Sequence, residues 1–446
     1  MSETRKVSLI SLGCPKNLVD SEGMVSDLLS NEIEMVVDPA DADLVVVNTC
    51  GFLGSAREES LGAIREAIAL KERGVRAVVV TGCMVGHYEK EIRAEAPGVD
   101  RLVDFADYAR IAQIADELLP AREAGASFVR PGRRVQARLT PAHFAYLKIS
   151  EGCNHTCSFC VIPRIRGRMR SVPREELVDR ARRLVALGAR ELNVVAQDST
   201  QYGIDLYGRR RLADLLRGLE TIEDLRWIRL LYAYPTEVDD DLLEVLAGDG
   251  ATLPYIDVPI QHVSDRMLTA MRRQSTEAQV EDLMIRLRRR VPDLVIRTTL
   301  IVGFPGETEE DVEKILDFVS RHRIDRLGVF PYSPEEGSPA ASLEDAIPDE
   351  VKQDRIDRIM TRQREISRAR NEALVGREIE VLVEDPGENG GEARGRTWMD
   401  APEIDGGVRI EGPSPAPGRI VRARVTAAEA YDLVVRPIET PEADRR

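Results

Sequence analysis

Three of the six cysteines fall within eight residues, at Cys153, Cys157 and Cys160, with three and then two residues between them. This spacing is too tight for disulfides between separate elements, and it differs from the paired two-residue spacing of structural zinc sites. Thiolates clustered on one loop are instead typical ligands of an iron–sulfur cluster. A 4Fe–4S cluster held by three cysteines leaves one iron without a protein ligand, and we expect that iron to bind and activate a small molecule.

The other three cysteines, Cys14, Cys50 and Cys83, lie far apart in the sequence but share a local context. Each follows a predicted strand, precedes a predicted helix and has a glycine beside it. Because the carboxyl ends of parallel strands meet at one edge of a sheet, we expect the three thiols to lie on one rim. Two interpretations remain open: three unrelated buried cysteines, or a second cluster with three protein ligands. The shared glycine context favours the second cluster.

The elements that position these cysteines are predicted for an N-terminal domain of residues 4–118. Apolar runs at Lys6–Leu12, Asp43–Val47 and Arg76–Val80 predict strands, each followed by a helical segment. Short, continuous apolar strands that alternate with helices are typical of a parallel sheet covered on both faces. We therefore predict a doubly wound α/β domain.

A connector of residues 119–140, which contains proline, glycine and several arginines, precedes a central domain of residues 141–370. Strand-like and helix-like segments alternate there, and the first strand, His143–Ile149, leads directly into the three-cysteine loop. Six such units predict a partial, open (βα)6 barrel, whose active site lies at the carboxyl ends of the strands. The later strands are expected at Glu191–Ala196, Trp227–Tyr232, Tyr255–Pro259, Leu294–Ile301 and Arg326–Pro331.

A C-terminal domain is predicted over residues 371–437, where five strand-like segments separated by proline and glycine indicate a small antiparallel β-barrel. Between Gly376 and Pro437 it has eight arginines and twelve acidic residues, a net charge of about −4. Because phosphate binding depends on cationic residues, this domain is poorly suited to RNA. We expect Asp400, Glu403 and Asp405 to offer a surface to a basic partner instead.

The whole chain has a net charge of −15 and an isoelectric point near 5.1, which argues against a protein whose main task is to bind nucleic acid. No run of about 18 or more apolar residues predicts a membrane span. The N-terminus enters a strand-like segment without the apolar core of a signal peptide. We therefore expect a cytoplasmic protein, where clustered cysteines indicate metal binding or catalysis, and we expect a monomer.

The Cys-x3-Cys-x2-Cys loop after a first barrel strand, with Phe159 between its last two cysteines, resembles the radical S-adenosylmethionine (SAM) superfamily. The resemblance implies that the open iron binds the methionine moiety of SAM. It also implies that one-electron reduction cleaves SAM to a radical that abstracts a substrate hydrogen. No catalytic residue beyond the cluster ligands is identified. By their positions along the strands, five residues are implied to surround SAM: Gln197, Gln261, Arg297, Gly303 and Gly306.

The segment Lys148–Gly167, together with the N-terminal cysteines, is similar to the methylthiotransferase family. The resemblance implies two 4Fe–4S clusters, with SAM as both methyl donor and radical source. It also implies a one-electron reductant protein of the flavodoxin or ferredoxin type. The SAM-binding cluster would be held by Cys153, Cys157 and Cys160, and an auxiliary cluster that handles sulfur by Cys14, Cys50 and Cys83. Four arginines follow the cluster loop: Arg164, Arg166, Arg168 and Arg170. Two interpretations are open: their side chains bind an acidic substrate or the carboxylate of SAM, or they form a run that faces solvent.

The segment Gly395–Gly406 resembles the TRAM domain that closes methylthiotransferases, and its string Asp-Ala-Pro-Glu-Ile-Asp-Gly resembles enzymes of the RimO type. This implies addition of sulfur and a methyl group at the β-carbon of an aspartate on small-subunit ribosomal protein twelve. That protein is a basic partner, which the enzyme would bind either free or within the small subunit. Because TRAM domains commonly bind RNA, the same chemistry on a tRNA adenosine is the alternative. A non-catalytic iron–sulfur sensor or scaffold and a zinc protein are the other candidates.

Overall fold

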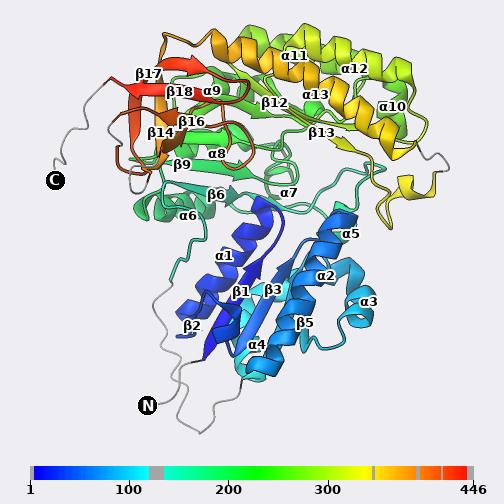
Figure 1. Ribbon diagram of the computed structural model, residues 1–446, viewed down its shortest axis with the longest axis vertical. Helices are drawn as coiled ribbons and strands as arrows, with labels where there is room; N and C mark the ends of the chain where they lie inside the picture. Colours follow the sequence, from blue (N-terminus) through cyan, green and yellow to red (C-terminus); the bar gives the residue numbers. More distant parts are fainter. Residues whose placement is uncertain (1–4, 120–134, 344–346, 388–391, 413–414, 439–446) are drawn as a thin grey trace.

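The computed structural model describes residues 5–119, 135–343, 347–387, 392–412 and 415–438. The chain forms three domains, and the N-terminal and C-terminal domains both pack against the central one (Figure 1). Most of the predicted connector 119–140 lies outside the described residues. Within the described part of the chain, no helix combines the length and the apolar character that a membrane crossing requires.

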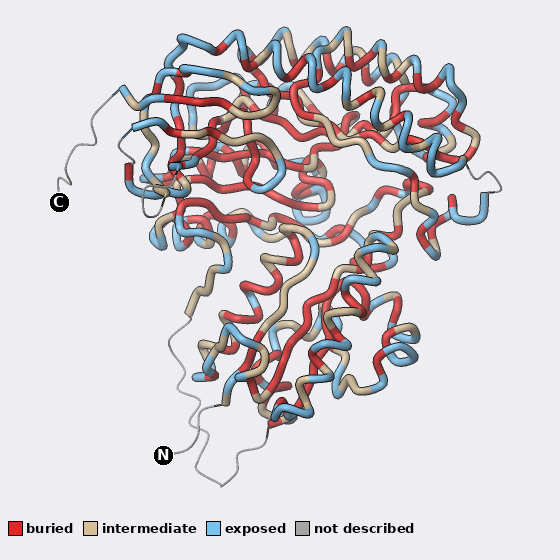
Figure 2. Tube along the Cα trace, in the orientation of Figure 1, coloured by how far each residue is buried: buried red, intermediate tan, exposed pale blue. Residues whose placement is uncertain are grey.

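The N-terminal domain is a five-stranded parallel sheet in the order β2-β1-β3-β4-β5. Helices α1 and α4 pack on one face and α2 and α3 on the other, so β3 and β4 are buried along their whole length (Figure 2). This confirms the doubly wound fold. The strands are β1 (Lys6–Ser11), β2 (Glu34–Met35), β3 (Leu44–Thr49), β4 (Ala77–Gly82) and β5 (Arg101–Val103). The helices are α1 (Pro15–Ser30), α2 (Gly54–Ala69), α3 (Val85–Glu95) and α4 (Ile111–Leu118).

The central domain is a six-stranded parallel sheet in the order β13-β12-β11-β10-β9-β6, with β6 and β13 at its edges, which confirms the predicted open barrel. The strands are β6 (Phe144–Lys148), β9 (Glu191–Val195), β10 (Trp227–Leu230), β11 (Thr252–Asp257), β12 (Val295–Val302) and β13 (Arg326–Pro331). The covering helices are α6 (Arg174–Ala186), α8 (Leu212–Glu220), α9 (Asp240–Ala247), α11 (Glu277–Arg290), α12 (Glu309–His322) and α13 (Asp349–Glu372). Short elements are β7 (Ser150–Glu151), β8 (Arg170–Ser171), α5 (Ile162–Ile165), α7 (Ile204–Tyr207) and α10 (Asp265–Ala270).

The C-terminal domain is a closed barrel in the order β14-β15-β16-β18-β17. Four of its pairings are antiparallel, as predicted, whereas β16 pairs with β18 in parallel. The parallel pair arises because β17 lies between β16 and β18 in the sequence but beside β14 in the sheet. The strands are β14 (Glu378–Asp385), β15 (Ala393–Arg396), β16 (Val408–Ile410), β17 (Ile420–Ala428) and β18 (Leu433–Pro437).

The two outer domains meet opposite ends of the central barrel. Phe144, Trp227 and Val295, at the starts of their strands, share an apolar core with Val381 and Val408 of the C-terminal barrel. At the other end, where the strands finish, α1 of the N-terminal domain packs against the last residue of β6. The C-terminal domain therefore closes the strand-start end, and the N-terminal domain covers the strand-finish end, where active sites of such barrels lie.

Candidate functional site

The loop with Cys153, Cys157 and Cys160 follows β6 and β7 at the strand-finish end of the central barrel. Gly152, just before the first cysteine, has a φ of 78°, and a Cβ there would lie 2.4 Å from the carbonyl oxygen of Arg168. The N–H of Cys153 donates to the carbonyl of Gly167 at 3.1 Å. The loop is therefore folded back on the segment that follows it, and only glycine fits the turn that presents the first thiol.

Each of the three sulfurs accepts a hydrogen bond from a protein nitrogen. Burial raises the pKa of the Cys153 thiol to about 11 and that of the Cys160 thiol to about 12, so both keep their protons near neutral pH when no metal is bound. Nitrogen donors of this kind stabilise metal-bound thiolates, whose formation releases those protons. The donors are His155 N at 3.4 Å from Cys153, Ile162 N at 3.5 Å from Cys160 and Arg273 Nη1 at 3.6 Å from Cys157.

Contacts with the barrel hold the middle of the loop. The N–H of Ser158 donates to the carbonyl of Met271 at 2.9 Å, and its hydroxyl donates to the carbonyl of Ala270 at 2.8 Å. Phe159 packs against the apolar group that contains Met271 and Phe304. The aromatic residue between the last two cysteines therefore anchors the loop by packing its partly buried ring against the barrel, which costs no polar contact.

Two rings and a cation stack beside the loop, an arrangement not anticipated from the sequence. The rings of His155 and Tyr234 are parallel, with centroids 3.7 Å apart, and His155 Nε2 lies 2.6 Å from a carboxylate oxygen of Asp198. The guanidinium of Arg273 lies over the same tyrosine, with Cζ 4.2 Å from the ring centroid. The stack fixes Arg273 against the Cys157 sulfur. The position of His155 between two loop cysteines was the available sequence signal.

The structure brings the three cysteines of the N-terminal domain to one rim, where β1, β3 and β4 finish. A Cβ on Gly13 would lie 2.7 Å from the Cβ and 2.9 Å from the Sγ of Cys50, so the loop with Cys14 passes directly over Cys50. A Cβ on Gly51 would lie 3.1 Å from the carbonyl carbon of Cys83. Each loop thus packs closely on its neighbour at the glycine that adjoins its cysteine. A larger residue would not fit there, which explains why a glycine stands next to each of the three cysteines.

The donor chemistry of both groups fits clusters. Among the described residues, no three His, Cys, Asp or Glu side chains converge on a point that could hold one metal ion. The three cysteines that hold a 4Fe–4S cluster each bind a different iron, so they lie farther apart than the ligands of a single metal ion. Two groups of three free thiols suit this arrangement. Burial by itself would raise the pKa of the Cys14 thiol, but the charge of Lys16 and the N–H of Asn17 outweigh this effect, so the pKa is lowered. Burial raises the pKa of Cys50 to about 11.

Arg166 connects the two cysteine groups. Its side chain is 1% exposed. One nitrogen, Nη2, donates to Cys83 Sγ at 3.3 Å and to the side-chain oxygen of Asn17 at 3.2 Å. The other, Nη1, donates to both carboxylate oxygens of Glu151, at 2.9 and 3.0 Å, two residues before Cys153. A residue that follows the barrel loop therefore reaches a cysteine of the N-terminal domain, and the two groups lie on the two sides of this contact.

A buried network of charges surrounds Arg166. Lys148, at the end of β6, pairs with Asp20 of α1 and lies 2.7 Å from Glu151, and Asp20 also lies 3.1 Å from Arg166. Although burial opposes it, Lys148 and Arg166 hold the pKa of Glu151 at about 2. The amide of Gln197 donates to the same carboxylate at 3.0 Å. Two cations and two carboxylates thus fix α1 to the barrel, and Gln197 lies beside the cysteine loop.

The arginine run after the loop divides into two kinds of residue. Arg164, Arg168 and Arg170 are exposed, so the interpretation as a solvated run fits these three. Arg166 is buried and pairs with carboxylates of the protein itself, which neither interpretation anticipated. Burial of this one member follows from the partners that α1 and β7 supply.

Three further residues expected around SAM lie at strand ends. Gln261 has a φ of 71° and its N–H donates to the carbonyl of Thr299 at 2.9 Å. Gly303 and Gly306 have φ values of 72° and 83°, and the N–H of Gly303 donates to Glu307 at 2.6 Å. The two glycines shape the turn between β12 and α12, and Glu307 closes that turn from within.

Of the three acidic residues expected on the surface of the C-terminal domain, two have buried side chains, so that expectation is wrong for them. The side chain of Asp400 is 2% exposed and lies 2.7 Å from Arg326. The side chain of Asp405 is 4% exposed and lies 3.3 Å from Arg297, the residue that was expected at SAM. Only Glu403 is exposed. The prediction failed because the net charge of the C-terminal domain does not include the arginines of the central barrel, which pair with these two aspartates.

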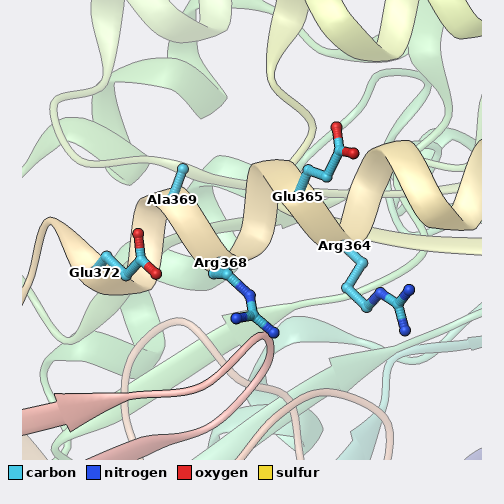
Figure 3. Close-up of a pocket in the computed structure, with 5 residues that line it drawn as sticks. All are labelled: Arg364, Glu365, Arg368, Ala369 and Glu372. Atoms are coloured by element: carbon cyan, nitrogen blue, oxygen red, sulfur yellow. The ribbon is translucent and has the colours of Figure 1, made fainter.

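The surface of the described residues also has a hollow of about 470 Å³ on α13 (Figure 3). Side chains of both charge signs, from successive turns of one helix, form its wall. The lining residues are Arg364, Glu365, Arg368, Ala369 and Glu372. Neither a cysteine nor a strand end is among them, so this hollow is separate from the site between the cysteine groups.

Comparison with known proteins places the chain in a family. Residues 147–319 match the radical SAM superfamily, residues 6–104 an uncharacterized protein family, UPF0004, and residues 375–438 the TRAM domain. The chain is 46% identical to the ribosomal protein uS12 methylthiotransferase RimO of Anaeromyxobacter sp. (strain Fw109-5), over 99% of this chain and 95% of that protein. The RimO of Geobacter sulfurreducens is 45% identical over 96% of this chain and 98% of its own. The chain belongs to the RimO family.

Solved structures show the same architecture outside the RimO family. The radical SAM methyltransferase TsrM from Kitasatospora setae, solved with tryptophan and a SAM analogue, aligns with a TM-score of 0.57 and 17% identity. The alignment covers 76% of this chain and 75% of that one. At this identity the likeness concerns the fold, and it agrees with the open parallel barrel described above.

Proposed function

We propose that this RimO-family protein is a radical SAM methylthiotransferase that adds sulfur and a methyl group at the β-carbon of an aspartate on ribosomal protein uS12. The observation that supports the proposal is the contact through Arg166, which joins Cys83 of one three-cysteine group to Glu151, two residues before the other group. The full-length similarity to proteins named uS12 methylthiotransferase supports the substrate. Because that substrate is a ribosomal protein, we place the reaction in the cytoplasm.

The six cysteines suit two 4Fe–4S clusters. We assign the SAM-binding cluster to Cys153, Cys157 and Cys160, and an auxiliary cluster to Cys14, Cys50 and Cys83. When bound, the clusters and SAM supply radical chemistry at an unactivated C–H bond, the sulfur and the methyl group. We further propose that a flavodoxin- or ferredoxin-type protein delivers the electron. The monomeric state stays a prediction.

The protein's own residues position the reactants. Lys148 and Arg166 balance Asp20 and Glu151, and so hold the two cysteine loops in one fixed relation. Because the C-terminal domain seals the strand-start end, we propose that SAM and the substrate enter from the strand-finish end. Gln197, which donates to Glu151, suits a place beside SAM. For Gln261, Gly303 and Gly306 the same role is proposed from their places at strand ends, whereas Arg297 is occupied by Asp405.

The test uses the reconstituted protein with SAM, a low-potential reductant and a sulfide source. Purified uS12, free or in small subunits, should gain the mass of one methylthio group in place of one hydrogen, located on an aspartate by fragmentation. Total tRNA incubated in parallel should show no methylthioadenosine. Modified tRNA with unchanged uS12 would establish the alternative substrate. Intact SAM in every incubation would support a non-catalytic iron–sulfur protein.

A further inference from the structure

Lys16 lies where the N-terminal domain meets the mouth of the central barrel. It is the second residue of α1, two positions after Cys14, and it is only 9% exposed. Its ammonium nitrogen lies 3.4 Å from the ring centroid of Tyr232, which follows β10 at the strand-finish end. The ammonium therefore reaches from the cysteine rim of one domain to the active rim of the other.

Lys16 differs from the other buried cations of this interface in having no carboxylate partner among the described residues. Lys148 and Arg166 both pair with Asp20 and Glu151. In the part of the chain that the structure describes, no carboxylate oxygen lies within 4.0 Å of the Lys16 nitrogen. The groups that act on it are Tyr232, the Cys14 thiol and the Arg166 guanidinium. A buried ammonium that has no carboxylate partner is uncommon, because burying a charge costs free energy unless the charge is paired.

Tyr232 supports Lys16 from a strained position. Its φ of 61° lies in the left-handed region, which a bulky residue other than glycine seldom adopts. The neighbouring chain imposes this backbone conformation, because its N–H donates to Asp257 at 3.0 Å and its carbonyl accepts from Ser199 at 2.9 Å. Strain of this kind concentrates at functional sites, and here it holds the ring face against the ammonium.

We propose that Lys16 binds the side-chain carboxylate of the aspartate that is modified. This inference rests on the proposed function and adds the residue that selects the substrate. The β-carbon is one bond from that carboxylate, so an ion pair with Lys16 places the reacting carbon between the two cysteine groups. Substrate binding supplies the carboxylate that this ammonium lacks, and asparagine or alanine at the same position leaves it with only the ring of Tyr232 and the Cys14 sulfur.

The test measures binding of fluorescent uS12 to the reconstituted enzyme, comparing the target aspartate with its asparagine variant. Wild type should prefer aspartate by about tenfold or more, because asparagine leaves the buried ammonium without a carboxylate. Lys16→Met should remove this preference by weakening only the aspartate form, and Lys16→Arg should keep part of it. Lys314→Met, which removes a surface lysine paired with Glu277, is the matched control and should behave as wild type.

A second measurement separates substrate recognition from service to the auxiliary cluster. Iron content and the midpoint potential of that cluster are determined for Lys16→Met without substrate. An unchanged preference for aspartate in Lys16→Met would overturn the proposal, and a shifted potential would then identify Lys16 as a charge partner of Cys14. Wild type that neither binds nor modifies uS12 would overturn the proposed function itself. These outcomes therefore distinguish a wrong role for Lys16 from a wrong proposed function.

Discussion

The two ends of the central barrel are both held by buried ion pairs, but the pairs serve different purposes. At the strand-start end, Glu191 lies 2.8 Å from Arg229 and 2.6 Å from Arg396, and an apolar core continues into the C-terminal barrel. At the strand-finish end, Asp20 and Glu151 face Lys148 and Arg166, which also contacts the thiol of Cys83.

The difference lies in which buried charged groups lack an oppositely charged side chain. At the strand-start end the arginines and carboxylates satisfy one another and no thiol is near, so we interpret that end as structural. The strand-finish end contains Lys16, which no carboxylate of the described residues pairs, the strained Tyr232 and two groups of cysteines. Buried ion pairs alone therefore do not mark function, since breaking one is costly wherever it lies. Unpaired groups and strain beside them are the better signal.

The largest expected effect comes from removing the barrel cysteines together. The triple variant Cys153→Ala, Cys157→Ala, Cys160→Ala should lose all methylthiotransferase activity and all SAM cleavage. It should keep about four irons per chain if the N-terminal cysteines hold their own cluster. Iron and sulfide analysis against wild type checks this. Complete loss of iron would contradict two independent clusters.

The next effect tests the strand-start end. Glu191→Gln leaves Arg229 and Arg396 without their common carboxylate, both pairs being fully buried, and should lower the free energy of unfolding by about 3–5 kcal/mol near neutral pH. Iron content and uS12 affinity of the folded variant should match wild type. Glu380→Gln, which breaks a half-exposed pair with Arg226, is the control and should change stability by less than about 0.5 kcal/mol.

The same variant has a defined pH dependence. Burial by itself would raise the pKa of Glu191, but the charges of Arg396 and Arg229 outweigh this effect, so its pKa lies below the ordinary value of 4.5. A depressed pKa contributes stability that is present above the unfolded value and is lost as pH falls through the folded value. The stability advantage of wild type over Glu191→Gln should therefore shrink only below about pH 4.5. Urea denaturation across that range measures it, and a difference that persists unchanged into strong acid would contradict the ion-pair account.

A smaller loss of stability, with a spectroscopic change, is expected at the strand-finish end. Arg166→Gln should cost about 2–3 kcal/mol, because Lys148 still pairs with Asp20 and Glu151. It should also shift the potential of the auxiliary cluster, since the N–H donor to Cys83 is lost. Redox titration followed by electron paramagnetic resonance measures this, with exposed Arg164→Gln as control. An unchanged potential would limit Arg166 to joining the domains.

How far the sequence predicts this arrangement depends on whether the signal is local. The barrel cysteine loop is contiguous, and the strand ends carrying Cys14, Cys50 and Cys83 follow from alternating strands and helices, so both groups were predicted. Lys16 and Arg166 were not, because their roles depend on packing between domains. Asp400 was misplaced for the same reason: its partner Arg326 is 74 residues away in the sequence.

The smallest expected effect decides what the C-terminal domain contributes to substrate binding. Burial raises the pKa of Asp400, whereas arginines lower that of Glu191, so the charged form of Asp400 is stabilised less. Asp400→Asn, which keeps an oxygen that can accept from Arg326, should therefore cost only about 1 kcal/mol, with no change in uS12 affinity. Exposed Glu403→Gln should change neither stability nor affinity beyond error. Binding measured at low and high salt is the check, because an acidic docking surface would show screening. A salt-dependent loss of affinity in Glu403→Gln alone would locate a basic partner at the one acidic residue of the three that solvent reaches, and would give the strand-start end a function that its matched charges do not indicate.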